Sequence, residues 1–156
     1  MGKFNNKISA EFTPPKKWKL ERALSYKNDE IDVDALEKIG LKCPAHRVTA
    51  KKGFVTDLAS VHRVCWNVLA PWDIARAAII HDLLYKAIRQ YRSKFAKGLA
   101  NEDYGVVTRA KKAADDVFLM GMKDADPSVP AWKIQTAYRA VQLFGRWSII
   151  PRKDNS

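Results

Sequence analysis

The sequence has few cysteines, no long apolar run, no internal repeat and no low-complexity segment. Its two cysteines, Cys43 and Cys65, are not in the Cys-x-x-Cys spacing of metal or redox motifs, so we expect a reduced pair. No apolar run is long enough to span a bilayer, and we therefore expect no membrane span. Lys3 and Lys7 are not followed by an apolar stretch, which argues against a cleaved secretory signal and favours the cytoplasm.

Acidic residues are also in the minority, with 17 Asp and Glu against 28 Lys and Arg and a formal net charge of +11. A surface of this charge attracts polyanions such as nucleic acid, anionic lipid, wall polymers or an acidic protein. The sequence has no zinc finger or RNA-recognition aromatic motif, so it predicts no sequence-specific nucleic-acid module. Hydrophobic residues make up 47% and charged residues 29%, which is typical of one globular domain at a length of 156 residues.

Composition divides the chain into a polar N-terminal arm (1–16), a single globular domain (17–146) and a basic C-terminal tail (147–156). The arm ends in two prolines and is expected to lack structure of its own. Within the domain, partly alternating polarity predicts strands in 17–27 and in 46–55, the second with a Lys-Lys-Gly turn inside it.

Helical signals follow these strands. Asp34-Ala35-Leu36-Glu37 is a capping-box pattern for a short helix that Gly40 closes. Longer helices are predicted over 74–91, from Asn101 to about Lys123, and from Pro130 to a stop at Gly145, with 93–100 as a linker. We therefore predict an α+β fold, with a small N-terminal antiparallel sheet followed by three packed helices.

Two of the predicted helices carry polar residues on or beside their apolar faces. At 100° per residue, His81 falls in the middle of the first apolar face and Asp82 at its flank. On the second helix Asp115 lies at the edge of the apolar face, whereas Asp116 lies opposite and is expected to face solvent. If the two helices pack as an antiparallel pair, His81, Asp82 and Asp115 converge, and Asp57 at the end of the strand region can reach the same place.

Such a set of side chains is suited to metal chemistry. His81, Asp82, Asp115 and Asp57 are candidate ligands of a divalent metal such as Zn²⁺, Mn²⁺ or Fe²⁺, which would lower the pKa of a bound water and generate a nucleophile. The same residues are also candidate catalytic acids and bases. An equally weighted alternative is a buried hydrogen-bond network that locks the sheet to the helices and has no catalytic role.

The set is also suited to general-base chemistry without a metal. An aspartate would orient His81 as the base, with the hydroxyl group of Ser60 or Thr56 as its partner. Thr56, Ser60, Arg63 and Tyr85 are candidates for contacts with a substrate, and Arg63 suits an anionic group. The alternative for Tyr85 is a core position with its hydroxyl hydrogen-bonded.

Three motifs carry a family resemblance: GFVTDLAS at Gly53–Ser60, HDLLY at His81–Tyr85, and Ala-Asp-x-x-Phe at Ala114–Phe118. In this order they resemble a small family of uncharacterised phage and prophage proteins with the pattern Gly-Phe-x-Thr-Asp-x-Ala-Ser-x-Pro-Arg, His-Asp-x-Leu-Tyr and Ala-Asp-x-x-Phe. The resemblance covers roughly residues 17–145 and departs from the pattern at His62, which stands where the family has proline. It implies a phage or prophage origin, and hence a place in the host cytoplasm or the virion, but no particular reaction.

Two functions of different classes follow from these features. One is a small metal-dependent hydrolase that acts on an anionic or cell-wall substrate through the Asp/His site. The other is a non-catalytic virion component of tail, baseplate or head, which docks on phage structural proteins or an anionic polymer through its basic surface.

Overall fold

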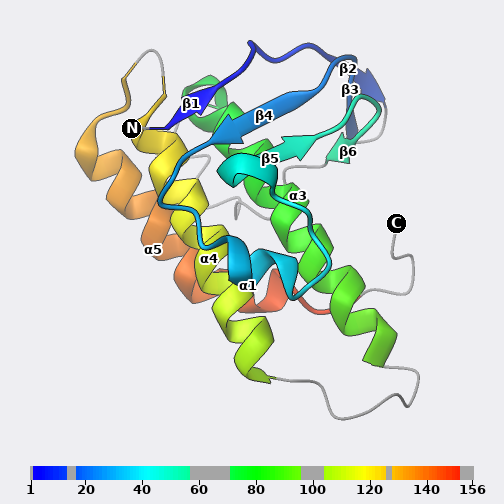
Figure 1. Cartoon of the computed structure of the whole chain (residues 1–156). Coiled ribbons are helices and arrows are strands. Elements are labelled where there is room, and N and C mark those ends of the chain that lie inside the picture. The colour runs from blue at the N-terminus through cyan, green and yellow to red at the C-terminus, as the bar shows by residue number, and fades with distance from the viewer. Residues whose placement is uncertain (1, 14–16, 57–70, 96–103, 126–127, 152–156) are drawn as a thin grey trace.

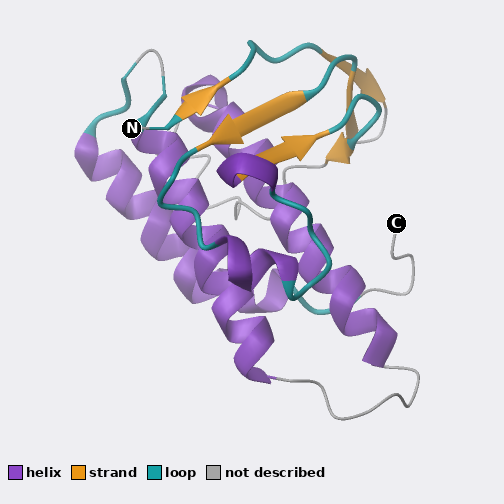
Figure 2. Cartoon of the chain, viewed as in Figure 1, coloured by secondary structure: helices purple, strands orange, loops and turns teal. Residues whose placement is uncertain are grey.

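The computed structural model describes residues 2–13, 17–56, 71–95, 104–125 and 128–151. Short strands come first and three long helices follow, so the predicted α+β class is confirmed (Figures 1 and 2). The elements are β1 (Lys3–Phe4), β2 (Ala10–Thr13), β3 (Lys17–Leu20), β4 (Leu24–Lys27), α1 (Val33–Glu37), the 3-10 turn η1 (Pro44–His46), β5 (Arg47–Ala50), β6 (Val55–Thr56), α3 (Pro71–Phe95), α4 (Tyr104–Lys123) and α5 (Ala131–Ser148).

The strands form two antiparallel three-stranded sheets, where the sequence suggested a single one. One sheet has the order β1-β4-β5, and the other has the order β2-β3-β6. The side chains of β5 alternate, with Val48 and Ala50 buried and Arg47 and Thr49 exposed, which is the pattern of a strand with one face on the core. The Lys-Lys-Gly turn that precedes β6 is confirmed, and Gly53 provides the positive φ that this turn needs.

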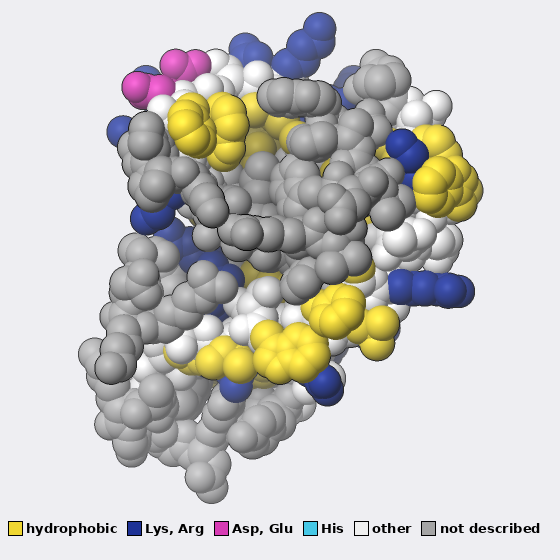
Figure 3. Space-filling model, turned by 180° about the vertical axis from the view of Figure 1, so that it is seen from behind, with side chains coloured by type: hydrophobic (Ala, Val, Ile, Leu, Met, Phe, Trp, Pro, Cys, Tyr) yellow, Lys and Arg dark blue, Asp and Glu magenta, His cyan; other side chains and the backbone are white. Residues whose placement is uncertain are grey.

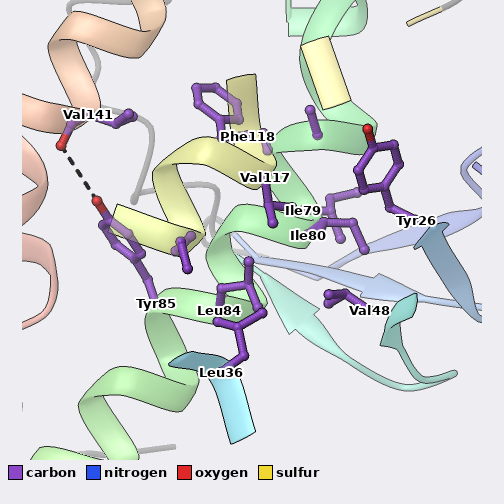
Figure 4. Close-up of a cluster of buried hydrophobic side chains, with 14 of the residues drawn as sticks. Tyr26, Leu36, Val48, Ile79, Ile80, Leu84, Tyr85, Val117, Phe118 and Val141 are labelled. Atoms are coloured by element: carbon purple, nitrogen blue, oxygen red, sulfur yellow. Dashed lines mark hydrogen bonds between the residues drawn. The ribbon is translucent and has the colours of Figure 1, made fainter. Parts of the chain in front are cut away.

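The helices pack against the β1-β4-β5 sheet and against each other. Helix α3 contacts β4, β5 and β6 on one side and α4 on the other, and α4 is in turn contacted by α5 and α1. Tyr26 and Val48 from the sheet meet Ile80 and Leu84 of α3 and Phe118 of α4 in the core (Figure 4). Within the described residues no helix combines the length and the apolar character that crossing a bilayer requires.

The segment 2–13, which composition assigned to a polar arm, contributes strands β1 and β2 to the two sheets. Phe4 of β1 is buried and its ring lies 4.7 Å from that of Tyr26. The start of the predicted tail is also attached to the helices. Ile149 is buried, and Arg92 of α3 donates to its carbonyl group at 3.1 Å.

Two helix-end predictions are wrong. The cap of α1 is Asp32 and not Asp34, because the Asp32 side chain accepts from the Ala35 amide at 3.2 Å. Gly145 does not stop the last helix, which continues to Ser148. It lies inside α5 for a packing reason, because a Cβ atom at this position would collide with the Tyr85 hydroxyl group. The predicted cap at Asn101 lies outside the described residues.

Candidate functional site: a buried histidine and aspartate

The HDLLY motif lies in the middle of α3. This part of the helix is buried, so its polar side chains need hydrogen-bond partners within the protein. His81 and Tyr85 are four residues apart and therefore share one face of α3, which is directed to α4. Their rings are in contact, with centroids 4.0 Å apart, and the Phe118 ring lies 4.9 Å from that of His81. His81 and Tyr85 have no exposed surface, so their polar atoms depend on partners within the protein.

Asp115 of α4 provides that partner. The Nε2 atom of His81 lies 3.0 Å from Oδ1 of Asp115, and the Tyr85 hydroxyl donates to the same oxygen at 2.6 Å. Oδ2 accepts from Nζ of Lys111 at 2.7 Å. Tyr85 also lies 3.5 Å from the Val141 carbonyl of α5 (Figure 4). Because a hydroxyl group has one proton, the shorter contact with Asp115 is the hydrogen bond.

These contacts keep Asp115 ionised. Burial alone would raise its pKa, but the hydrogen bonds from His81, Lys111 and Tyr85 hold the pKa of Asp115 below its ordinary value. The pKa of Tyr85 is raised by burial and then by the Asp115 charge, so its hydroxyl remains a donor. With an ionised Asp115 as acceptor, Nε2 of His81 carries a proton.

The other imidazole nitrogen has no comparable anchor. Nδ1 of His81 is buried and has no hydrogen-bond partner among the described residues. A buried nitrogen without a partner loses its hydration and gains nothing in exchange, which costs about 1–3 kcal/mol. Orphaned polar atoms of this kind are uncommon in folded proteins, and each requires a reason.

Asp82 belongs to a separate contact. It follows His81 directly and is therefore rotated by about 100° around α3, toward the β2-β3-β6 sheet. The Thr56 hydroxyl of β6 donates to Oδ2 of Asp82 at 2.6 Å, and both residues are buried. The pair joins the sheet to α3.

The structure thus brings only part of the predicted site together. His81, Tyr85 and Asp115 meet between α3 and α4, whereas Thr56 and Asp82 meet at the sheet. The remaining predicted residues, Asp57, Ser60 and Arg63, lie outside the described residues. Among the residues that are described, no group of three His, Cys, Asp or Glu side chains is placed to hold a metal ion.

Sequence reasoning missed Lys111 as a member of the cluster. Lys111 is four residues before Asp115 on the same helix, and this spacing is a sufficient signal for an ion pair. The next pair along, Lys112 and Asp116, repeats the spacing on the outer side of α4. Asp116 is half-buried there and accepts from the Tyr138 hydroxyl at 2.8 Å, so it is less open to solvent than expected.

These features define an α+β protein with a buried, ionised aspartate that anchors a histidine between two helices. Residues 36–141, more than half of the chain, match the family described as protein of unknown function (DUF1353). The chain belongs to this family, so the prediction of an uncharacterised family is confirmed, whereas the phage or prophage origin stays a prediction. Searches of the curated proteins and of the solved structures gave no match.

Proposed function

We propose that the chain is a small hydrolase in which His81 is the general base and Asp115 the residue that orients it. The observation that carries this proposal is the asymmetry of the imidazole group. Nε2 is anchored on Asp115 at 3.0 Å, and Nδ1 has no partner among the described residues. An imidazole with one nitrogen anchored on a carboxylate and the other available to accept a proton is the arrangement of a catalytic base.

The chemistry follows from the charges. Nδ1 takes a proton from water or from a hydroxyl nucleophile, and the positive charge that develops on the ring is stabilised by Asp115. Lys111 and Tyr85 hold both oxygens of that carboxylate in place, so the carboxylate does not have to reorient during the reaction. Because His81 is fully buried, a substrate group must reach Nδ1 through movement of the surrounding side chains.

A divalent metal would alter this scheme. Nδ1 of His81 could serve as a metal ligand, but both oxygens of Asp115 already accept hydrogen bonds. Asp115 lies against Nε2, on the other side of the ring from Nδ1, so the two groups cannot bind one metal ion as they stand. The general-base scheme uses the contacts as they stand, and for this reason it is the form of the hydrolase that the geometry supports best.

The substrate class rests on charge. The net charge of +11 favours an anionic substrate, such as a phosphodiester or an acidic cell-wall polymer. Suitable probes are a chromogenic phosphodiester, a chromogenic ester and purified peptidoglycan, each assayed with and without added Mn²⁺ or Zn²⁺.

The adjacent residues Asp115 and Asp116 allow a matched pair of variants that test the proposed catalytic role. Asp115→Asn and His81→Gln should each lower the hydrolysis rate about 100-fold or more, because general-base catalysis contributes at least that factor. Asp116→Asn should keep the wild-type rate, since Asp116 lies outside the cluster. Circular dichroism and the melting temperature report whether each variant folds. The proposal fails if the wild type hydrolyses none of the probes, or if the folded Asp115→Asn variant is as active as the wild type.

A further inference from the structure

Helix α5 presents an apolar ridge to solvent, made of Trp132, Leu143, Trp147 and, just after the helix, Ile150. Their exposed fractions are 61%, 65%, 52% and 48%. Only two other large hydrophobic side chains in the described residues are exposed, Phe12 and Val55 in the β2-β3-β6 sheet. Concentration of exposed apolar surface on one element marks an interaction site more strongly than scattered residues do.

The ridge has two parts on one side of α5. At 100° per residue, positions 132 and 143 fall within about 20° of one another, and position 147 lies about 40° from 143. Trp132 is three turns before Leu143, and exposed polar residues, among them Thr136 and Arg139, lie between them. The opposite side of α5 carries Ile134, Val141 and Gly145, which are buried against the other helices. The apolar residues of the ridge are therefore spread along the outer side of α5 over about 22 Å, from Trp132 to Trp147, and Ile150 follows the end of the helix.

Positive charge lies within the same sector. Arg139 and Arg146 are exposed and fall between the apolar residues, and the Arg146 guanidinium lies 4.3 Å from the centroid of a Trp147 ring. Lys133 lies over Trp132 at 5.8 Å. There is no Asp or Glu between residues 128 and 151, so the helix offers no negative charge of its own. Seen from behind, hydrophobic side chains gather in groups with Lys and Arg side chains beside them (Figure 3).

We propose that this ridge binds the surface of an anionic lipid bilayer. The combination of tryptophan, aliphatic residues and arginine on one helix face is that of helices that lie in the membrane interface, where indole rings and arginine side chains suit the headgroup region. The absence of acidic residues makes the face complementary to anionic headgroups. This inference is independent of the proposed hydrolase.

Other occupants fit the ridge less well. A second copy of the chain would bring Arg139 and Arg146 against like charges. Single-stranded nucleic acid binds by stacking successive bases on neighbouring aromatic rings, but the two tryptophans are about 22 Å apart along the helix, with aliphatic Leu143 between them. These alternatives are separate outcomes of the test.

The test uses the full chain with two kinds of vesicle. Vesicles of phosphatidylcholine with one third phosphatidylglycerol should sediment the protein and shift its tryptophan emission to shorter wavelength. Pure phosphatidylcholine should do so at least about tenfold more weakly, and salt should weaken the binding.

Matched variants identify the surface. Arg139→Glu should weaken binding to the anionic vesicles about tenfold or more, because reversal replaces an attraction by a repulsion. Lys52→Glu changes the net charge equally at an exposed turn on another part of the molecule and should have a smaller effect. Leu143→Ser should also weaken binding, whereas Phe12→Ser, an exposed apolar residue away from α5, should not.

Several results would overturn the proposal. These are no sedimentation with either vesicle, equal loss in Arg139→Glu and Lys52→Glu, or normal binding by Leu143→Ser. A concentration-dependent dimer that Leu143→Ser abolishes would assign the ridge to a second copy instead. Tight binding to single-stranded DNA that competes with vesicles and is lost in Trp147→Ser would assign it to nucleic acid.

Discussion

At the scale of single residues, Tyr85 and Gly145 are packed so closely that no side chain fits at position 145. The Tyr85 hydroxyl donates to Asp115 in the space that a side chain at position 145 would occupy. Glycine is poor in helix interiors because it loses more backbone entropy than alanine does. Its presence within α5 is explained by this contact, which lets α5 approach the His81–Asp115 cluster.

Gly145→Ala should therefore destabilise the protein even though alanine is the better helix former. We expect a loss of about 1–3 kcal/mol in the free energy of unfolding, because the tyrosine hydroxyl must move from Asp115. In a Tyr85→Phe background the same substitution should be less costly, although the ring carbons Cζ and Cε2 still lie 3.0 and 3.2 Å from the new Cβ. Urea unfolding of the four proteins of this double-mutant cycle gives the coupling energy.

Tyr138→Phe provides the comparison for that cycle. The Tyr138 hydroxyl binds Asp116 and is not near Gly145, so the effects of Tyr138→Phe and Gly145→Ala on the free energy of unfolding should be additive. A coupling between residues 85 and 145 that is no larger than that between 138 and 145 would contradict the role assigned to the glycine.

Periodicity predicted part of this residue-scale arrangement. The 100° rule correctly turned His81 and Asp115 inward, because burial of apolar faces fixes how a helix is rotated. It placed Asp116 on the other side of the helix, where the residue is half-buried and not fully exposed. It could not show that Asp82 pairs with Thr56, since that contact depends on which strand lies beside α3. Pairing between distant elements is decided by tertiary packing, about which a single helical wheel carries no information.

At the scale of elements, α1 shows how one residue can both start a helix and hold it in place. Asp32 caps the Ala35 amide, and its two oxygens also accept from Nε and Nη2 of Arg109 on α4 at 2.9 and 3.0 Å. The capping box starting at Asp34 was a reasonable sequence pattern, but Asp34 lies in the first turn of α1. Asp32 has Ala35 three positions later and so does not match the capping box, but its side chain caps the helix without that partner.

Asp32→Ala should lower the free energy of unfolding by about 1–2 kcal/mol, most of it from the lost cap. Arg109→Ala removes only the half-exposed ion pair and should cost less than about 1 kcal/mol. Asp32→Asn keeps a good cap and should resemble Arg109→Ala. Asp34→Ala is the matched control. If it destabilises as much as Asp32→Ala in urea unfolding, then the assignment of the cap to Asp32 is wrong.

At the scale of the whole molecule, buried polar contacts tie each layer to the next. Tyr26 in β4 donates to Asp124 just after α4 and accepts from Asn28, while Tyr85 joins α3 to α4. The Gly2 amide also donates to Asp124 at 3.0 Å, which fastens the N-terminal strand to the helices. No sequence pattern indicates that attachment, because strands of two to four residues are too short for periodicity and their pairing is non-local.

The two buried tyrosines make the fold sensitive to alkaline pH. Burial raises the pKa of both Tyr26 and Tyr85 above the ordinary value of 10, and neighbouring carboxylates raise it further. A group with a raised pKa in the folded state contributes stability that is complete below the unfolded pKa and is lost as pH rises above it. The free energy of unfolding should therefore fall above about pH 10, by about 1.4 kcal/mol per pH unit for each tyrosine.

Urea unfolding between neutral pH and about pH 11 measures that slope. The variants Tyr26→Phe and Tyr85→Phe start from lower stability at neutral pH, because each loses a hydrogen bond to a carboxylate. Each should nevertheless show a shallower alkaline decline than the wild type, and the double variant the shallowest, since phenylalanine has no proton to lose. A decline of unchanged slope in the double variant would mean that other groups cause the alkaline unfolding. In that case the hydroxyls of Tyr26 and Tyr85 would not be the contacts through which high pH weakens the fold.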